Sequence, residues 1–173
     1  NRSLSAWLGG VVGAGFIVLY LVTLAPDILP ADNGEFQLVA ATVGLAHPPG
    51  FPLHTLLGTM LARLPVGTLP WRVNLLSAIL AAGTLVLVSA TVQRVTGRGL
   101  AGAAAAVALG TSTTFWAQAT MSNVRTPTAF LAAASVYALV RHAEAVSQQR
   151  SSDRALLLFA ALLALGLSHH LSL

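Results

Sequence analysis

Residues 73–92 read VNLLSAILAAGTLVLVSATV, a run of 20 residues without a charged side chain. An α-helix rises about 1.5 Å per residue, so this run is about as long as the hydrocarbon core of a bilayer is thick. The run therefore predicts a transmembrane helix. It indicates that the protein is a membrane protein, and the rest of the sequence can be tested against that class.

The composition of the whole chain agrees with a membrane protein. Of its 173 residues, 55% are hydrophobic and only 8% are charged, and the mean hydropathy is +0.77. A soluble domain carries about 25% charged residues, and one soluble core of this size could not bury so much apolar surface. The chain has no Cys, which excludes disulfides and Cys-based metal sites.

Four further apolar runs flank the first one. They cover residues 6–24, 100–119, 127–140 and 155–170. Together the five runs predict an all-α protein, a polytopic transmembrane helix bundle with about five spans. The chain begins without Met and stops in an apolar run, so we expect residues 1–173 to form one transmembrane domain at the N-terminal part of a longer protein.

The long connection between the first two spans, residues 25–72, contains two shorter apolar segments. Residues 36–46 and 52–64 are too short to cross a bilayer comfortably and predict interfacial or re-entrant helices packed on the bundle. The sequence His47-Pro48-Pro49-Gly50 separates them. Two prolines and a glycine cannot continue a helix, so this turn predicts a stiff bend.

The arginines predict how the bundle is oriented, because cytoplasmic loops carry an excess of basic residues. With the N-terminus in the cytoplasm, six arginines lie inside and three outside. The inner ones are Arg2, Arg94, Arg98, Arg141, Arg150 and Arg154, and the outer ones are Arg63, Arg72 and Arg125. Loop 25–72, turn 121–126 and the end at 169–170 then share the non-cytoplasmic face. No basic cluster is interleaved with exposed aromatics, so we expect no nucleic-acid partner.

Two acidic residues of the outer loop are the candidate catalytic groups. Asp32 and Glu35 lie one helical turn apart, so both could face one cavity. A fixed carboxylate at the membrane surface could act as a general base toward a hydroxyl, or could bind a divalent metal, which the sequence does not require. The alternative is structural: Asp32 and Glu35 could form a capping box that opens the helix over residues 36–46.

Further polar residues on the same face are candidate substrate ligands. They are His47, His54, Asn123, Arg125, His169 and His170. Arg125 could bind a phosphate, or could be an interfacial arginine that extends toward the headgroups. Asn123 could orient a sugar or cap its turn. Neighbouring helix positions point about 100° apart, so at most one of His169 and His170 should face a given site.

Several motifs resemble one bacterial membrane family, long of unknown function, that includes an animal endoplasmic-reticulum protein O-mannosyltransferase. They are Pro30–Phe36, Gly44–Leu53, Arg72–Leu75, Phe115–Ala119 and Gly166–His170. The family looks like a branch of the GT-C glycosyltransferases. The resemblance implies an enzyme of the bacterial inner (plasma) membrane. It would pass a sugar, with mannose as a candidate, from a polyprenyl-phosphate donor to a protein or glycan acceptor on the non-cytoplasmic face.

The resemblance also implies roles for residues. The base of the first outer loop falls on Asp32, with Glu35 as the second candidate. Two positions depart from the pattern: Asn33 stands where Ser is expected, and Asn123 stands where an acidic residue is expected before Val-Arg. If that acid is needed, this chain is weakened or uses another acceptor. The expected partners are the lipid-linked donor, the acceptor and membrane lipids.

Two alternatives belong to other functional classes. A non-enzymatic membrane scaffold would use Asp32 and Glu35 only as a capping box. A transporter would place ionisable residues within its spans and would contain broken helices in repeated halves. Charges in this chain lie at span ends and in loops, which places the transporter behind the other two.

Overall fold

The structure is a computed structural model that describes the backbone of residues 2–170 and the side chains from Trp7 onward. Residue 1 and residues 171–173, which the predicted domain includes, and the side chain of Arg2 lie outside the described part. Between residues 2 and 170 every regular element is a helix, which confirms the all-α prediction. The helices are α1 (Arg2–Thr23), α2 (Ala31–Thr42), α3 (Pro52–Ala62), α4 (Leu69–Thr96), α5 (Gly99–Gly110), α6 (Thr113–Ala119), α7 (Arg125–Ser147) and α8 (Asp153–His169).

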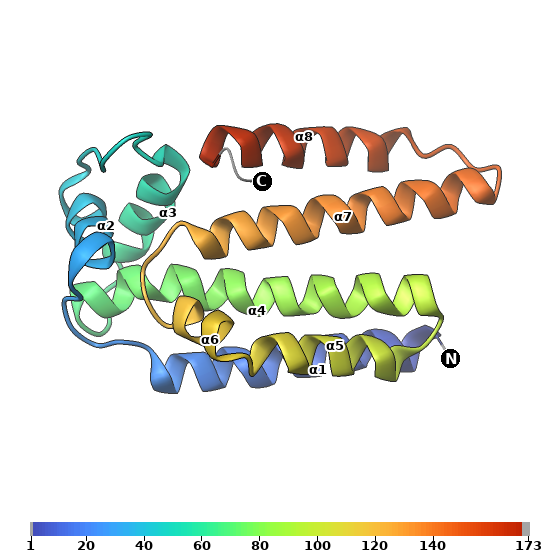
Figure 1. Cartoon of the computed structure of the whole chain (residues 1–173), viewed down its shortest axis with the longest axis horizontal. Coiled ribbons are helices and arrows are strands. Elements are labelled where there is room, and N and C mark those ends of the chain that lie inside the picture. Colours follow the sequence, from blue (N-terminus) through green and yellow to red (C-terminus); the bar gives the residue numbers. More distant parts are fainter. Residues whose placement is uncertain (1, 171–173) are drawn as a thin grey trace.

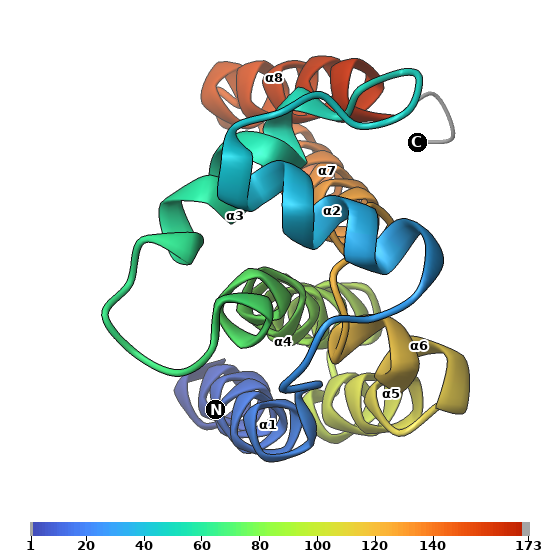
Figure 2. The same ribbon diagram turned by 90° about the vertical axis from the view of Figure 1, so that its left-hand side faces the viewer.

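Helices α1, α4, α5, α7 and α8 lie side by side along one axis, whereas α2, α3 and α6 lie toward one end of the bundle (Figure 1). Helix α4 is central and packs against α1, α5 and α7, and α8 packs on α7. Figure 2 looks onto the end with the short helices and shows α2 and α3 between α4 and α8. The outer loop, the turn before α7 and the end of α8 therefore meet at one end of the bundle.

Fewer helices are candidate membrane spans than the five predicted. By length and composition, α4 and α7 can each cross a bilayer, and α5 with α6 makes a third if the bent pair is one span. The apolar part of α1, residues 7–23, is shorter, and α8 has only 17 residues. Helix α7 is longer than the predicted run 127–140 at both ends. The additional residues are mostly polar, so hydropathy did not include them in the run.

The predicted span 100–119 is not one straight helix, because α5 and α6 meet at an angle of 74°. Ser112 Oγ donates a hydrogen bond of 2.8 Å to a main-chain carbonyl three residues back, and Thr111 Oγ1 bonds one four residues back at 2.8 Å. Such local bonds compete with the helix and bend it. Tyr20 OH donates to the freed carbonyl of Gly110 at 3.0 Å, which stabilises the break.

The outer loop forms the two short helices predicted, with shifted ends. Helix α2 begins at Ala31, five residues before the predicted segment 36–46, and ends at Thr42. The predicted capping box is wrong: the N-cap position is Pro30, with no side-chain capping bond, and Asp32 lies inside the first turn. Glu35 instead bonds to His47. The capping box, which was the only role of Asp32 and Glu35 in the scaffold alternative, is therefore not formed.

Candidate functional site

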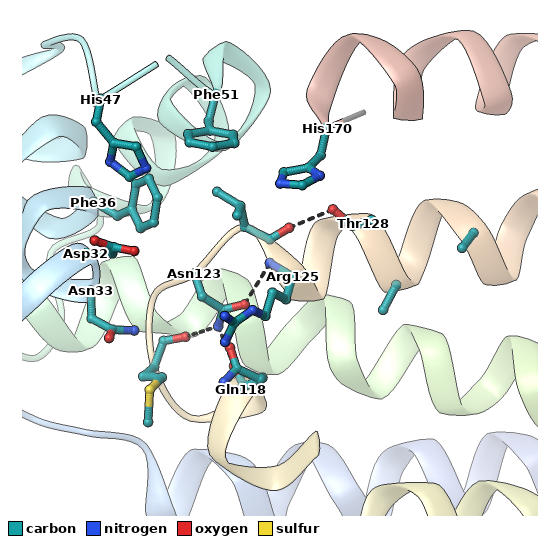
Figure 3. A pocket seen from close by; sticks show the side chains of 14 residues that line it. Asp32, Asn33, Phe36, His47, Phe51, Gln118, Asn123, Arg125, Thr128 and His170 are labelled. Carbon is teal, nitrogen blue, oxygen red and sulfur yellow. Dashed lines mark hydrogen bonds between the residues drawn. The ribbon is translucent and has the colours of Figure 1, made fainter. Parts of the chain in front are cut away.

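A cavity of about 600 Å³ opens at the end of the bundle where the short helices gather (Figure 3). Its walls come from α2, the bend before α3, the turn between α6 and α7, the start of α7 and the end of α8. The lining residues are Asp32, Asn33, Phe36, His47, Phe51, Gln118, Met121, Asn123, Val124, Arg125, Thr128, Ala129, Ala132 and His170. Of the eight predicted site residues, five line this cavity: Asp32, His47, Asn123, Arg125 and His170.

Glu35 lies beside the cavity and holds His47. Its Oε1 accepts the His47 main-chain N–H at 2.7 Å, and its Oε2 lies 2.7 Å from His47 Nδ1. The hydrogen bonds from His47 lower the pKa of Glu35. The bond to Glu35 and attraction from Glu35 and Asp32 raise the pKa of His47. Glu35 therefore fixes the orientation of the ring, as carboxylates do for catalytic histidines.

His54 and His169 lie behind the cavity wall rather than on it. Both side chains are only 1% exposed. His54 Nε2 lies 3.4 Å from Ser122 Oγ, and burial lowers the pKa of His54 to about 4, so this ring is neutral near pH 7. His169 Nε2 donates to the Val124 carbonyl at 3.3 Å. In this arrangement the two rings support the wall from which Val124 and His170 face the cavity.

Asn123 caps the start of α7 and also lines the cavity. Its Oδ1 accepts the N–H groups of Arg125 at 2.9 Å and Thr126 at 3.0 Å, although the nominal cap residue is one position later. Its Nδ2 donates to the carbonyls of Gln118 at 2.7 Å and Met121 at 2.6 Å. An ionised Asp could accept the first pair but could not donate the second. Asn123 thus satisfies both sets of partners at the position where the resemblance expects an acid.

Arg125 is the arginine of the cavity wall, and its side chain is exposed. Figure 3 shows its side chain reaching from the first residue of α7 toward Gln118. A second, smaller hollow of about 300 Å³ lies against α5, α6 and α7. It shares Gln118, Arg125 and Ala129 with the first cavity and adds apolar groups such as Leu109 and Phe115. Arg125 therefore stands where a polar cavity meets a more apolar one.

Aromatic rings form part of the cavity wall that the sequence did not reveal. Phe51 stacks on His170 with centroids 5.8 Å apart and an interplanar angle of 12°, and Phe36 lies 5.8 Å from the His47 ring. Phe51 has a φ of 45°, which is strained for a bulky residue and is held by the surrounding packing. The sequence feature that could have indicated Phe51 is its position directly after the predicted bend His47–Gly50 and before Pro52.

Three side chains could together hold a divalent cation. One oxygen each from Asp32 and Glu35 and a ring nitrogen of His47 lie within 4.8 Å of one another. Oxygen ligands with one imidazole suit several divalent metals. Both Glu35 oxygens already accept from His47, so a cation would have to displace the bond to Nδ1. Asp32, Glu35 and His47 therefore fit a hydrogen-bonded acid–base cluster better than a cation site.

Comparisons with known proteins relate most of the chain to one family. Residues 32–173 match the family described as Protein O-mannosyl-transferase TMEM260 N-terminal domain. The Protein O-mannosyl-transferase TMEM260 of Mus musculus is 36% identical over 106 residues, which cover 61% of this chain and 15% of that protein. The tmem260 protein of the same description from Dictyostelium discoideum is 33% identical over 78 residues, 43% of this chain and 10% of that protein.

No solved structure matches the chain. The chain spans only a small part of the two relatives. The cavity residues from Asp32 to His170 all fall within the matched range. Since that match covers far more than half of the sequence, the chain belongs to the family of the TMEM260 protein O-mannosyl-transferase N-terminal domain.

Proposed function

We propose that the protein containing this domain is a membrane glycosyltransferase of the GT-C type. It transfers a sugar, taken as mannose from the names of the relatives, from a polyprenyl-phosphate donor to a hydroxyl of a protein acceptor. The observation that carries this proposal is the single cavity in which Asp32 from α2 and Arg125 from α7 are both wall residues. Its volume of about 600 Å³ is in the range of small-molecule sites.

Asp32 acts as the general base in this proposal. It takes the proton of the acceptor hydroxyl while the hydroxyl oxygen attacks C1 of the sugar. The bond between C1 and the phosphate oxygen breaks, its electron pair stays with the phosphate, and polyprenyl phosphate leaves. Attack from the opposite side inverts the configuration at C1. Glu35 does not take part directly, because both of its oxygens hold His47 beside Asp32.

Arg125 binds the phosphate of the donor. A guanidinium donates two parallel hydrogen bonds to phosphate oxygens, and such charge-assisted bonds are about twice as strong as neutral ones. The sugar then occupies the polar cavity, and the first isoprene units enter the smaller hollow that shares Arg125. An amphipathic donor needs this arrangement, with a polar and an apolar compartment on either side of its phosphate.

The cavity faces the non-cytoplasmic side in this proposal, and α1 and α8 cross the membrane together with the candidate spans. Helix α1 packs along α4 and α8 along α7 (Figure 1). At about 1.5 Å per residue, the 22 residues of α1 are long enough to cross. The α4–α5 and α7–α8 connections are at the opposite end of the bundle from the cavity. They contain the predicted inner residues Arg98 and Arg150, and Arg94 and Arg154 lie in the adjoining helix turns. This arrangement supports the proposed orientation, with the N-terminus in the cytoplasm.

The test is sugar transfer by the full-length protein in lipid nanodiscs. Polyprenyl-phosphate mannose and a nucleotide-linked mannose are offered separately with a Ser/Thr peptide, and we expect transfer only from the lipid-linked donor. Arg125→Gln should raise the donor KM by roughly ten- to a hundredfold, because it removes a charged hydrogen-bonding partner. Arg63→Gln is the matched control, since Arg63 is exposed outside both hollows. Transfer from the nucleotide-linked sugar alone, or none from either donor, refutes the proposal.

A further inference from the structure

Asn74, in the second turn of α4, uses both ends of its amide although its side chain is fully buried. Its Oδ1 accepts the Ser122 main-chain N–H at 2.8 Å and Gln37 Nε2 at 3.0 Å. Its Nδ2 donates to the Ala25 carbonyl at 2.8 Å. One side chain thereby holds three segments that are far apart in the sequence.

These bonds connect two walls of the cavity. Gln37 lies on α2, the helix that carries Asp32, and Asn33 from the same helix donates to the Ser122 carbonyl at 2.6 Å. Ser122 lies in the turn that leads into α7 and Arg125. The wall with the proposed base and the wall with the proposed phosphate ligand are thus joined twice, through Asn74 and directly by the Asn33 bond to Ser122.

The network is buried and leads back to the start of the outer loop. Gln37 is 2% exposed and Ser122 is fully buried. The Leu29 N–H donates to Gln37 Oε1 at 3.2 Å, and the Ala25 N–H donates to the Thr120 carbonyl at 3.1 Å. Buried polar groups that lose a partner are costly to leave unpaired, so such networks fix one geometry.

We propose that Asn74 is a positioning residue that sets the separation of Asp32 and Arg125. This inference rests on the proposed function, because the separation matters only if the two residues act on one donor–acceptor pair. Asn74 does not line the cavity, so it acts through Gln37 and Ser122 rather than on the substrate. A displacement of about 1 Å at a reacting group can reduce the rate on the order of a hundredfold.

The inference predicts a loss in kcat rather than in donor binding. Arg125 is held by a separate set of bonds, since Asn123 caps α7 through its own contacts with Gln118 and Met121. Loss of Asn74 therefore loosens the α2 wall, which keeps only the direct Asn33 bond to Ser122, and leaves the proposed phosphate site in place. Loss of an interaction that aligns the reacting groups lowers kcat, whereas loss of one that only holds the donor raises KM.

The experiment measures transfer from polyprenyl-phosphate mannose by the full-length protein in nanodiscs. Asn74→Ala should lower kcat roughly ten- to a hundredfold with the donor KM unchanged. Thr84→Val is the matched control: Thr84 is also buried on α4, but its hydroxyl bonds only to the Leu80 carbonyl of its own helix. Its kcat should equal that of the wild type. A change in KM alone for Asn74→Ala overturns the positioning role.

A second variant and a second readout cover the case in which Asn74→Ala does not accumulate. Gln37→Met keeps the volume and removes the bonds to Asn74 and Leu29, so its kcat should also fall. Spin labels at Leu38 on α2 and Val136 on α7, both exposed, report the separation of the walls without any turnover. We expect a broader distance distribution in Asn74→Ala and Gln37→Met than in the wild type and Thr84→Val. Unchanged distances and unchanged kcat in Asn74→Ala and Gln37→Met overturn the inference. An inactive wild type would instead refute the proposed function, and the spin-label distances would still test the role of Asn74 because they need no turnover.

Discussion

At the scale of single residues, Glu35 and His47 show how a local pattern acquires its role from the fold. The sequence predicted Glu35 as a second base or as part of a capping box. The structure directs both of its oxygens to a residue 12 positions later. Charge and helical spacing identified the acidic pair, but the direction of the Pro-Pro bend, which brings His47 back to α2, depends on tertiary packing.

The ion pair of Glu35 and His47 predicts a pH window for stability. The pKa of folded His47 lies above its ordinary 6.5, so its contribution is complete below pH 6.5 and is lost as the pH rises through the raised pKa. The pKa of folded Glu35 lies below its ordinary 4.5, so its contribution is complete above pH 4.5 and is lost as the pH falls through the lowered pKa.

Glu35→Gln should therefore lower the thermal unfolding midpoint of the full-length protein most between pH 4.5 and 6.5. The effect should be small, because both side chains are solvent-accessible and exposed ion pairs contribute little. Unfolding curves of the wild type and the variant across this pH range provide the measurement. A difference that does not vary with pH would show that the pair is not formed.

Gly34 carries a steric requirement that also belongs to the residue scale. A Cβ built at this position would lie 2.1 Å from the Leu29 carbonyl oxygen. Gly34→Ala should destabilise the protein by about 1–3 kcal/mol, the usual range for overpacking, as measured by thermal unfolding in detergent. Gly15→Ala is the control, since nothing lies within 4 Å of its Cβ position. Equal unfolding of the two variants would contradict the close contact at Leu29.

At the scale of elements, the long apolar helices were predicted from hydrophobic length, and their breaks were not. The run 100–119 contains Thr111 to Thr114, which made its second half polar, but hydropathy cannot decide between a continuous helix and a bend. The bend of α5 and α6 depends on Tyr20, which lies 90 residues away in the chain from the carbonyl that it stabilises.

Tyr20→Phe tests this account of the bend. The change keeps the ring but leaves the buried carbonyl of Gly110 without its partner, which should cost about 1–3 kcal/mol. Thermal unfolding of the full-length protein measures the loss. Trp116→Phe provides a comparison, because its Nε1 bond to Thr23 Oγ1 lies at an exposed position and should contribute less. The account fails if Tyr20→Phe is as stable as the wild type.

At the scale of the whole molecule, the distribution of arginines predicted which loops share a face. The structure brings those loops to one end and thereby assembles Asp32, His47, Asn123, Arg125 and His170 around one cavity. The same reasoning could not separate these residues from His54 and His169, because topology assigns a loop to a side and only packing decides which side chains are buried. Asn74 was not among the predicted site residues although the motif Arg72–Leu75 contains it, because its place in an apolar run does not reveal the partners that packing brings to it.

The proposed orientation predicts which end reacts from outside the cell. Asp27→Cys, at the cavity end, should react with a membrane-impermeant maleimide on intact cells that lack other accessible cysteines. Ser151→Cys, at the opposite end, should react only after the membrane is permeabilised. Both positions are exposed, so burial does not explain a difference. The reversed labelling pattern would place the cavity on the cytoplasmic side.

The assignment of Asp32 as the base is tested most directly by sugar transfer with Asp32→Asn in the full-length protein. Asp27→Asn is the matched control, because Asp27 is an exposed carboxylate of the same loop outside the cavity. Loss of a general base typically lowers a rate by about 10²–10⁴-fold. We expect Asp32→Asn to insert and accumulate normally with transfer reduced by that factor, and Asp27→Asn to transfer at the wild-type rate. Wild-type transfer by Asp32→Asn would contradict the account.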